Sequence, residues 1–192
     1  MIGFCNGILT AMITPFCENG INLNELGKMI DYQIEGGTDA VVILGTTGEP
    51  ATMTESEKTE VIKYAVKHAA GRIKVIVGTG NNDTAKAVAA SVRAQELGAD
   101  GILAVTPYYN KCTQKGLLEY YKAICAAVTI PVIAYNVPSR TAVNILPETV
   151  EKLAEIPNMA GIKEASGNMA QVCETMRRIR GKMDLYSGED FL

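Results

Sequence analysis

The sequence predicts an α/β fold in which short buried strands alternate with longer helices. Seven short runs rich in β-branched residues start 24 to 34 residues apart, which is about the length of one strand and one helix. The runs are apolar at consecutive positions, as expected for parallel strands that helices cover. Between the runs stand residues that start and stop helices. Two architectures fit this alternation, a closed (β/α)8 barrel and an open doubly wound sheet, and periodicity alone does not choose between them.

The predicted strands follow one another along the whole chain. Their runs begin at or near Ile8, Ala40, Lys74, Gly101, Pro131, Ala160 and Asp184. A (β/α)8 barrel typically needs about 250 residues and eight strands to close. If the fold is a barrel, we therefore expect one that is truncated after the seventh strand, with the first and seventh strands exposed as edges.

The predicted helices begin at residues that cap backbone N–H groups. Thr54 and Glu57 have the spacing of a capping box, so a helix should begin directly after Thr54. Asp83, Thr113 and Asn168 are N-cap residues for three further helices. Apolar side chains at helical spacing predict a buried face for the helices rather than a cofactor site. Residues assigned to such faces include Val61, Ile62, Ala65, Val66, Ala69, Leu117, Ile124, Val128, Val172, Met176 and Ile179, together with Met29 and Met169.

The composition excludes several classes of protein. Apolar residues make up 47% and charged residues 20% of the chain, which is ordinary for a globular protein and argues against disorder. A net charge of −3 leaves no basic excess, so we expect no nucleic-acid partner. The longest apolar stretches, such as 40–44, are far shorter than the roughly 18 residues of a membrane span. Residues 1–6 lack the features of a signal peptide, so we expect none.

The cysteines and the single histidine indicate the redox compartment and limit the kinds of metal site that the chain can form. The five cysteines are scattered and never spaced as Cys-x-x-Cys, which is typical of free thiols in a reducing compartment and predicts a cytoplasmic protein. The single histidine, His68, excludes a metal site built from two or more histidine ligands. We interpret His68 as an exposed helix residue.

Polar side chains follow several of the predicted strands. Sites in α/β folds gather at the carboxyl ends of strands, so these residues are the candidates for binding and chemistry. Thr46 and Thr47 suit a carboxylate or phosphate, although these residues alone favour an ordinary strand-to-helix turn. Tyr109 has a stacking or surface role, whereas Tyr135 ends a strand and can act as a general acid or base. Arg140, on a Pro-restricted loop, either binds a carboxylate or is a surface arginine.

Lys163 is the candidate nucleophile. It directly follows an apolar strand, whereas lysine is rarely buried without a partner. Burial would lower the pKa of its amine and leave the neutral form that attacks a carbonyl group to make a Schiff base. The alternative is a structural ion pair with Glu164 or another nearby carboxylate.

Five motifs stand in order at the strand ends, and together they are more specific than any one of them. They are Gly-Thr-Thr-Gly-Glu at 45–49, Thr-Pro-Tyr-Tyr-Asn at 106–110, Tyr-Asn-Val-Pro-Ser-Arg-Thr at 135–141, Gly-Ile-Lys-Glu-Ala-Ser-Gly at 161–167 and Ser-Gly-Glu-Asp at 187–190. From about Gly7 onward, the chain resembles the dihydrodipicolinate synthase family of pyruvate-dependent class I aldolases, to which N-acetylneuraminate lyase is related. The resemblance implies a (β/α)8 TIM barrel, here a single domain over 1–192 without the last strand and the C-terminal helices.

The resemblance also implies roles for the residues at the reacting carbons. Lys163 would form a Schiff base with pyruvate, and Tyr135 would carry protons while hydrogen-bonded to Thr46. Tyr109 would complete this relay from a neighbouring subunit, which implies a homodimer or homotetramer. No metal and no organic cofactor is implied.

Three further residues would bind the substrates. Thr47 would hold the pyruvate carboxylate, and Gly188 would line the pocket through its backbone. Arg140 would hold the carboxylate of the second substrate, L-aspartate-4-semialdehyde. The resemblance thus implies a lyase that makes the cyclic precursor of diaminopimelate and lysine.

Two alternatives to this activity stay open. One is another pyruvate-dependent aldolase that acts on a sugar acid, although Thr46, Thr47 and Arg140 favour the synthase, since the related lyase commonly has Ser-Thr at 46–47 and lacks the segment around Arg140. The other is a catalytically incomplete fragment that carries all the motifs.

One departure from the family concerns regulation. Lysine-inhibited members tend to carry histidines at the positions of Glu55 and Lys58 and a glutamate at that of Lys86. Lys86 would repel the ammonium group of lysine. We therefore expect weak or absent feedback inhibition by lysine.

Overall fold

Seven parallel strands form one sheet in the computed structural model, which describes residues 3–18 and 20–189. The strands are β1 (Leu9–Ala11), β4 (Ala40–Ile43), β5 (Lys74–Gly78), β6 (Gly101–Val105), β7 (Val132–Asn136), β8 (Met159–Glu164) and β9 (Asp184–Ser187). Each pairs in parallel with the next of these strands along the chain, in the order β1-β4-β5-β6-β7-β8-β9. A doubly wound sheet reverses its order at a switch point. The unbroken order therefore identifies a barrel-type sheet, as the family resemblance implies.

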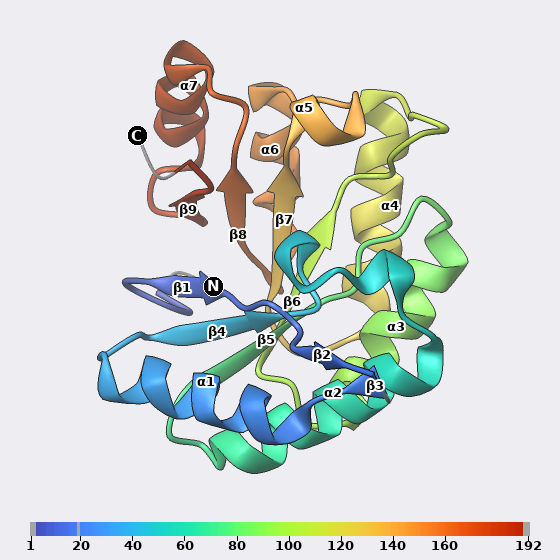
Figure 1. The fold of residues 1–192 in the computed structure, drawn as a ribbon. Coiled ribbons are helices and arrows are strands. Elements are labelled where there is room, and N and C mark those ends of the chain that lie inside the picture. The colour runs from blue at the N-terminus through green and yellow to red at the C-terminus, as the bar shows by residue number, and fades with distance from the viewer. Residues whose placement is uncertain (1–2, 19, 190–192) are drawn as a thin grey trace.

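The sheet curls so that its two edges come to the same side of the molecule. Figure 1 shows the edge strands β1 and β9 near each other at the left, with helices ranged round the outside of the sheet. No backbone pairing joins β1 to β9 within the described residues. The main chain of Gly3 nevertheless reaches β9, because its N–H donates to the carboxylate of Asp184, the first residue of that strand, at 2.8 Å. The sheet is a partial barrel that encloses a central space.

Helices cover the outer face of the sheet. They are α1 (Leu23–Glu35), α2 (Glu55–Ala69), α3 (Thr84–Glu96), α4 (Gln114–Ala127), the one-turn α5 (Pro138–Thr141), α6 (Pro147–Leu153) and α7 (Met169–Ile179). Short elements complete the fold: the hairpin of β2 (Phe16–Cys17) and β3 (Gly20–Ile21), and the 3-10 turns η1 (Thr46–Gly48) and η2 (Pro50–Thr52). In the part of the chain that the structure describes, no helix has the length and apolar character needed to cross a bilayer.

The predicted helix starts are confirmed. Thr54 and Glu57 form a capping box at the start of α2. Asp83 accepts hydrogen bonds from the first turn of α3, and Thr113 and Asn168 do the same for α4 and α7. Each cap satisfies N–H groups that have no partner inside the helix. Local sequence therefore sets where these helices begin.

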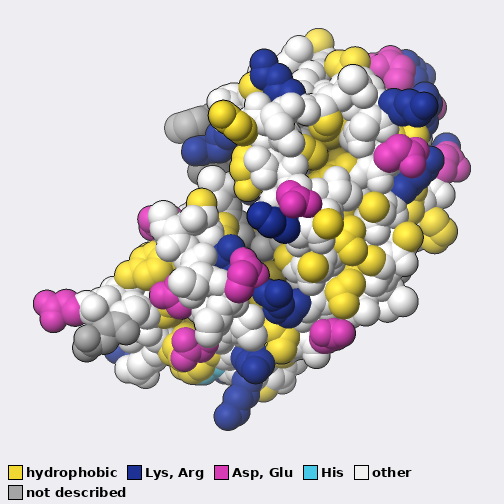
Figure 2. Space-filling view, turned by 90° about the vertical axis from the view of Figure 1, so that its right-hand side faces the viewer, with side chains coloured by type: hydrophobic (Ala, Val, Ile, Leu, Met, Phe, Trp, Pro, Cys, Tyr) yellow, Lys and Arg dark blue, Asp and Glu magenta, His cyan; other side chains and the backbone are white. Residues whose placement is uncertain are grey.

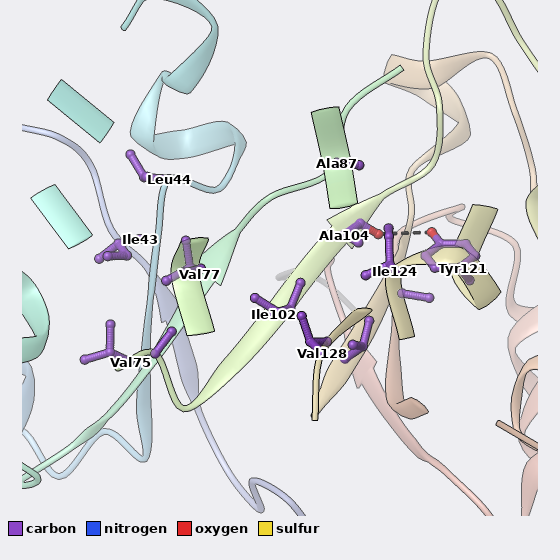
Figure 3. Packing of buried hydrophobic residues seen from close by; sticks show 14 of the residues in the cluster. Ile43, Leu44, Val75, Val77, Ala87, Ile102, Ala104, Tyr121, Ile124 and Val128 are labelled. Atoms are coloured by element: carbon purple, nitrogen blue, oxygen red, sulfur yellow. Dashed lines mark hydrogen bonds between the residues drawn. The ribbon is translucent and has the colours of Figure 1, made fainter. Parts of the chain in front are cut away.

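Alternate strand residues build two separate apolar layers. The larger layer lies between sheet and helices and includes Val75 and Val77 of β5 and Ile102 and Ala104 of β6, with Ala87 of α3 and Ile124 of α4 (Figure 3). Tyr121 of α4 donates its hydroxyl to the carbonyl of Ala104 at 3.0 Å. The smaller layer lines the inside of the curled sheet and includes Val42, Ile76, Leu103, Ile133 and Tyr135. Because successive side chains point to opposite faces, each of β4, β5, β6 and β7 contributes to both layers.

Two predictions about buried and exposed residues are wrong. Met169 and Met176 of α7, assigned to a buried face, are 47% and 49% exposed. They lie on the last described helix, whose neighbour α6 covers only one side of it. His68, assigned to the surface, is half-buried and hydrogen-bonded to Asp31 of α1 at 2.9 Å. A helical period shows which residues share a face, but the neighbouring elements decide whether that face is covered.

Replacing Gly78 with alanine is expected to destabilise the fold strongly. A Cβ atom at Gly78 would lie 2.1 Å from the carbonyl oxygen of Leu44 and 2.9 Å from the amide nitrogen of Gly45. Backbone atoms cannot move aside cheaply, so the free energy of unfolding should fall by about 3 kcal/mol. Gly45→Ala is the matched control, because its Cβ would meet only Val42 at 3.6 Å. Urea unfolding of both variants tests this, and equal stabilities would contradict it.

Candidate functional site

A cavity of about 1510 Å³ occupies the space inside the curled sheet. Its lining comes from the edge strands β1 and β9 and from the turns that follow β4, β7 and β8. Six of the seven residues assigned to the site line this cavity, namely Thr46, Thr47, Tyr135, Arg140, Lys163 and Gly188. The seventh, Tyr109, does not. The fold thus brings together residues that lie up to 142 positions apart, from Thr46 to Gly188.

The Lys163 side chain lines the cavity enclosed by the curled sheet, next to Tyr135. The two residues are direct partners in the register of β7 and β8, and the Nζ atom of Lys163 is 4.8 Å from the centre of the Tyr135 ring. Gly188 packs against the lysine stem, since a Cβ atom there would lie 2.9 Å from the Cε atom of Lys163. Its own N–H donates to the carbonyl of Glu164 at 2.8 Å. A glycine at 188 therefore leaves room for the lysine chain.

Tyr135 is a buried phenol with an altered acidity. Burial is the main cause that raises its pKa above the ordinary value of 10.0, and the charge of Glu189 acts in the same direction. The positive charge of Arg140 and hydrogen bonding with the Thr46 side chain act in the opposite direction. The raised pKa keeps the phenol neutral near pH 7, so it is a hydrogen-bond donor beside the Lys163 amine.

Thr46 and Thr47 are presented by the turn η1. This turn is closed by the Gly48 N–H, which donates to the Gly45 carbonyl at 2.9 Å. The buried Thr14 hydroxyl donates to the carbonyl of Gly48 at 2.7 Å and ties the turn to the segment after β1. Leu44 and Glu49, on either side of the turn, have left-handed backbones with φ of 54° and 56°. The threonine side chains are left exposed towards the cavity.

Arg140 lies in the one-turn helix α5 rather than in the loop that the sequence predicts. Pro138 occupies its first position, where a missing N–H costs nothing. The buried Thr141 hydroxyl donates to the carbonyls of Val137 and Val143 at 3.2 and 3.0 Å. Arg140 itself is exposed and lines the cavity. The short helix holds its guanidinium at the mouth of the site.

Tyr109 projects away from the described molecule. It is 91% exposed and has a left-handed backbone, with φ of 70°. It lines a second cavity of about 810 Å³, whose wall also includes Thr46, Tyr135 and Arg140. These three residues are among those that line both cavities, whereas Tyr109 lines only the second, outer cavity.

The outer cavity also contains the positions linked to regulation. Glu55, Lys58 and Lys86 all line it. Glu55 forms ion pairs with Lys58 at 2.8 Å and Arg93 at 2.5 Å. Acidic and basic side chains lie next to one another across the face seen in Figure 2, beside gathered hydrophobic side chains. The effect of lysine on the protein stays a prediction.

Sequence reasoning missed a group of buried polar residues behind the site. Asn136 and Glu164 follow Tyr135 and Lys163 directly and are 0% and 3% exposed. A polar residue after each catalytic candidate was a visible signal, but the sequence does not show that both become buried. The last residue of the fifth motif, Asp190, lies outside the described residues.

Comparisons with known proteins agree on one family. The model of the Dihydrodipicolinate synthetase family matches residues 4–192. The 4-hydroxy-tetrahydrodipicolinate synthase of Caldicellulosiruptor bescii is 54% identical over 181 residues, which are 94% of this chain and 61% of that protein. The corresponding enzyme of Clostridium tetani is 51% identical, with 94% and 62% covered. The chain thus spans about three fifths of the length of these curated relatives.

Solved structures show the same likeness. The dihydrodipicolinate synthase of Aquifex aeolicus is 48% identical, with a TM-score of 0.93 over 96% of this chain and 63% of that one. The chloride-inhibited enzyme of Acinetobacter baumannii, solved in complex with pyruvate, is 45% identical, with a TM-score of 0.93 over 96% and 64%.

Proposed function

The chain belongs to the dihydrodipicolinate synthetase family, and from this premise we propose that Lys163 forms a Schiff base with pyruvate. The observation that carries the proposal is the position of Lys163 inside the cavity, 4.8 Å from the ring of a neutral tyrosine. A Schiff-base aldolase needs an amine, a proton carrier and a carboxylate anchor within reach of one another. Lys163, Tyr135 and the pair Thr46 and Thr47 supply these groups around one space.

The proposed reaction begins at the keto group of pyruvate. The neutral Lys163 amine attacks the carbonyl carbon, Tyr135 donates a proton to the oxygen, and water leaves as the iminium forms. Tyr135, now deprotonated, takes a proton from the pyruvate methyl group, which gives an enamine. The enamine carbon then adds to the aldehyde of L-aspartate-4-semialdehyde, and Tyr135 returns the proton to the aldehyde oxygen, which becomes a hydroxyl group. Attack of the semialdehyde amine on the iminium carbon closes the ring and returns the Lys163 amine, and the product is 4-hydroxy-tetrahydrodipicolinate.

The proposal gives binding roles to three further residues. Thr47 holds the pyruvate carboxylate, Gly188 leaves room beside Lys163, and Arg140 holds the carboxylate of the semialdehyde at the mouth of the site. The covalent link to Lys163 is the means of activation, so the proposal assigns no metal and no organic cofactor. The chain would therefore act as a lyase on two small molecules, on the route to diaminopimelate and lysine.

We further propose that a second copy of the chain completes the site. Tyr109 is 91% exposed and lines the outer cavity, which Thr46 and Tyr135 also line. In a homodimer, alone or within a homotetramer, Tyr109 would extend the proton relay in the partner. We assign this assembly to the cytoplasm, where the five cysteines, all unpaired in the structure, stay reduced.

Reductive trapping tests the proposed function directly. The protein is incubated with pyruvate and sodium borohydride, and its peptides are mapped by mass spectrometry. We expect one pyruvyl adduct on the peptide that contains Lys163. Absence of the adduct from the folded protein would overturn the proposal, and an adduct spread over surface lysines would mean non-specific reductive amination.

Replacing Arg140 with alanine should separate the two substrates. Loss of a charged hydrogen-bonding partner for the semialdehyde carboxylate should raise its KM about 10- to 100-fold. Trapping of pyruvate should be unchanged, because Arg140 does not hold that substrate. Arg177→Ala, which removes an exposed arginine paired with Glu174, is the control. Equal loss of both substrates in Arg140→Ala would contradict the assignment, and a preference for sugar-acid aldehydes would favour the alternative aldolase.

A further inference from the structure

A buried polar cluster lies directly behind the candidate site, between the sheet and α7. We call it the Asn–Glu cluster and define it as Asn136, Asn144, Glu164 and Gln171. Asn136 and Glu164 end β7 and β8, Asn144 follows α5, and Gln171 lies in α7. Glu164 is 3% exposed, and the polar atoms of a buried side chain need hydrogen-bond partners to offset the loss of water.

Three neutral groups supply donors to Glu164. The Asn136 amide donates to both carboxylate oxygens, at 3.2 and 3.0 Å. The Ser166 N–H donates to Oε1 at 2.8 Å, and the Gln171 amide approaches Oε2 at 3.4 Å. Both carboxylate oxygens therefore accept, and neither is placed to donate. This arrangement is specific for a carboxylate. A glutamine at position 164 would place its own NH₂ group against one of these donors, where it would find no acceptor.

The surrounding amides cannot rotate to relieve such a conflict. Asn144 accepts from Asn136 at 2.9 Å and from Gln171 at 3.1 Å, and its own NH₂ donates to Gln171 at 2.8 Å. Rotating Gln171 would require Asn144 to rotate as well, which would set its NH₂ against that of Asn136. The carboxylate of Glu164 thus determines the orientation of the whole cluster.

The cluster includes one residue from each of the two strands that carry Tyr135 and Lys163, so its hydrogen bonds depend on how these strands are paired. Asn136 and Glu164 are direct partners in β7 and β8, one position beyond the pair Tyr135 and Lys163. The pairing of these strands is irregular between Val132 and Ile133, so their register shifts within the sheet. A slip of one residue would turn Lys163 out of the cavity and into the helix layer. The side-chain bonds of Asn136 to Glu164 hold the register where the site needs it.

Asn136 also forms hydrogen bonds with residues at the far end of the segment that carries Arg140. The Ile145 N–H donates to the Asn136 side-chain oxygen at 2.9 Å, and the Asn136 amide donates to Asn144. These bonds join the two ends of the segment 137–144. One buried cluster therefore connects the tyrosine, the lysine and the arginine of the proposed mechanism.

We propose that Glu164 is a positioning residue, which acts through Asn136 to hold the Lys163 amine in its reactive place. This inference rests on the proposed function for its chemical purpose, but the placement of Lys163 can be measured without any substrate. Glu164 touches neither substrate, because its side chain lies on the helix side of β8.

The test compares Glu164→Gln with Glu174→Gln, which makes the same change in the exposed ion pairs of α7. Each folded protein is labelled with a trace of acetic anhydride, and mass spectrometry gives the acetylation of Lys163 relative to the exposed Lys122. We expect the ratio to change several-fold in Glu164→Gln and to stay at the original value in the control. An unchanged ratio in a folded Glu164→Gln protein, with only a lower Tm, would mean a purely structural role and overturn the proposal.

Pyruvate trapping provides the second readout. We expect the maximal trapping rate of Glu164→Gln to fall about tenfold or more, because small misplacements of a reacting group are costly. The pyruvate concentration for half-maximal trapping should change much less, since Thr47 is untouched. An unchanged maximal rate would also overturn the proposal. If the original protein traps no pyruvate, the proposed function fails while the acetylation ratio still decides the placement of Lys163.

A second variant covers the case in which Glu164→Gln does not fold. Gln171→Ala removes one half-buried donor and keeps the carboxylate. Its acetylation ratio should move away from the original value by a smaller amount. A ratio equal to that of the original protein would then count against the proposal.

Discussion

Replacing Lys163 with arginine is expected to abolish the pyruvate adduct. The guanidinium keeps the positive charge and a similar length but stays protonated, so it has no lone pair for attack on a carbonyl carbon. Because the adduct itself requires the amine of residue 163, the loss should be complete in the borohydride assay. This is the largest effect that we expect from any single change.

Lys182→Arg is the matched control for this prediction. Lys182 is exposed and pairs with Glu155 at 2.6 Å, so its replacement should leave trapping unchanged. Circular dichroism should show that both variants are folded. A pyruvyl group found on another lysine of Lys163→Arg, at the rate seen in the original protein, would contradict the assignment of Lys163.

Replacing Tyr135 with phenylalanine is expected to have the second largest effect. The ring and its packing remain, but the hydroxyl that donates a proton beside Lys163 is lost. Loss of a general acid or base typically slows a reaction about 10²- to 10⁴-fold, so the trapping rate should fall by about a hundredfold or more. That rate is measured by quenching the trapping reaction at a series of times, with pyruvate at a saturating concentration.

Tyr186 offers a close control for Tyr135. It pairs with Lys163 from the other neighbouring strand, β9, so both tyrosines flank the same lysine in the sheet. Tyr186 also lines the cavity, but its hydroxyl lies 3.4 Å from the carboxylate of Asp184, the first residue of β9, whereas Thr46 and Arg140 lie near Tyr135. Tyr186→Phe should therefore trap pyruvate at nearly the original rate. Equal losses in the two variants would show that the effect comes from packing rather than from proton transfer.

The pH dependence of trapping provides a further check on Tyr135. Only the neutral phenol can donate a proton, and burial raises its pKa above 10.0. The contribution of Tyr135 should therefore be fully present below pH 10 and be lost as the pH rises through the higher value of the folded protein. Trapping in cyanoborohydride across this range measures it. A loss of rate centred well below pH 10, absent from Tyr135→Phe, would contradict the raised pKa.

Local sequence was sufficient for the larger elements of the fold. The apolar runs at Ala40, Lys74, Gly101 and Asp184 begin the strands at those residues, and the capping residues start the helices where they were expected. Very short elements were missed. The two-residue strands β2 and β3 and the single turn α5 are too short to show a period, so only their contacts with the rest of the chain define them.

Much of the candidate site was also predictable, for a simple reason. The carboxyl ends of parallel strands meet at one end of a barrel, so residues at those ends share a site whatever their distance in sequence. Thr46, Tyr135 and Lys163 line one cavity for this reason. Tyr109 is the exception, since its turn carries it outward to 91% exposure.

The sequence by itself determined the strand and helix order, the caps and the chemical types of residue at each strand end. Only the tertiary structure decided how the sheet closes and which face each of those residues occupies. Tyr135 and Asn136 are neighbours in the chain, yet one faces the cavity and the other a buried cluster of amides. The same holds for Lys163 and Glu164. A strand sends successive side chains to opposite faces, and only the elements packed on each face determine whether a side chain meets substrate, solvent or a hydrogen-bonded interior.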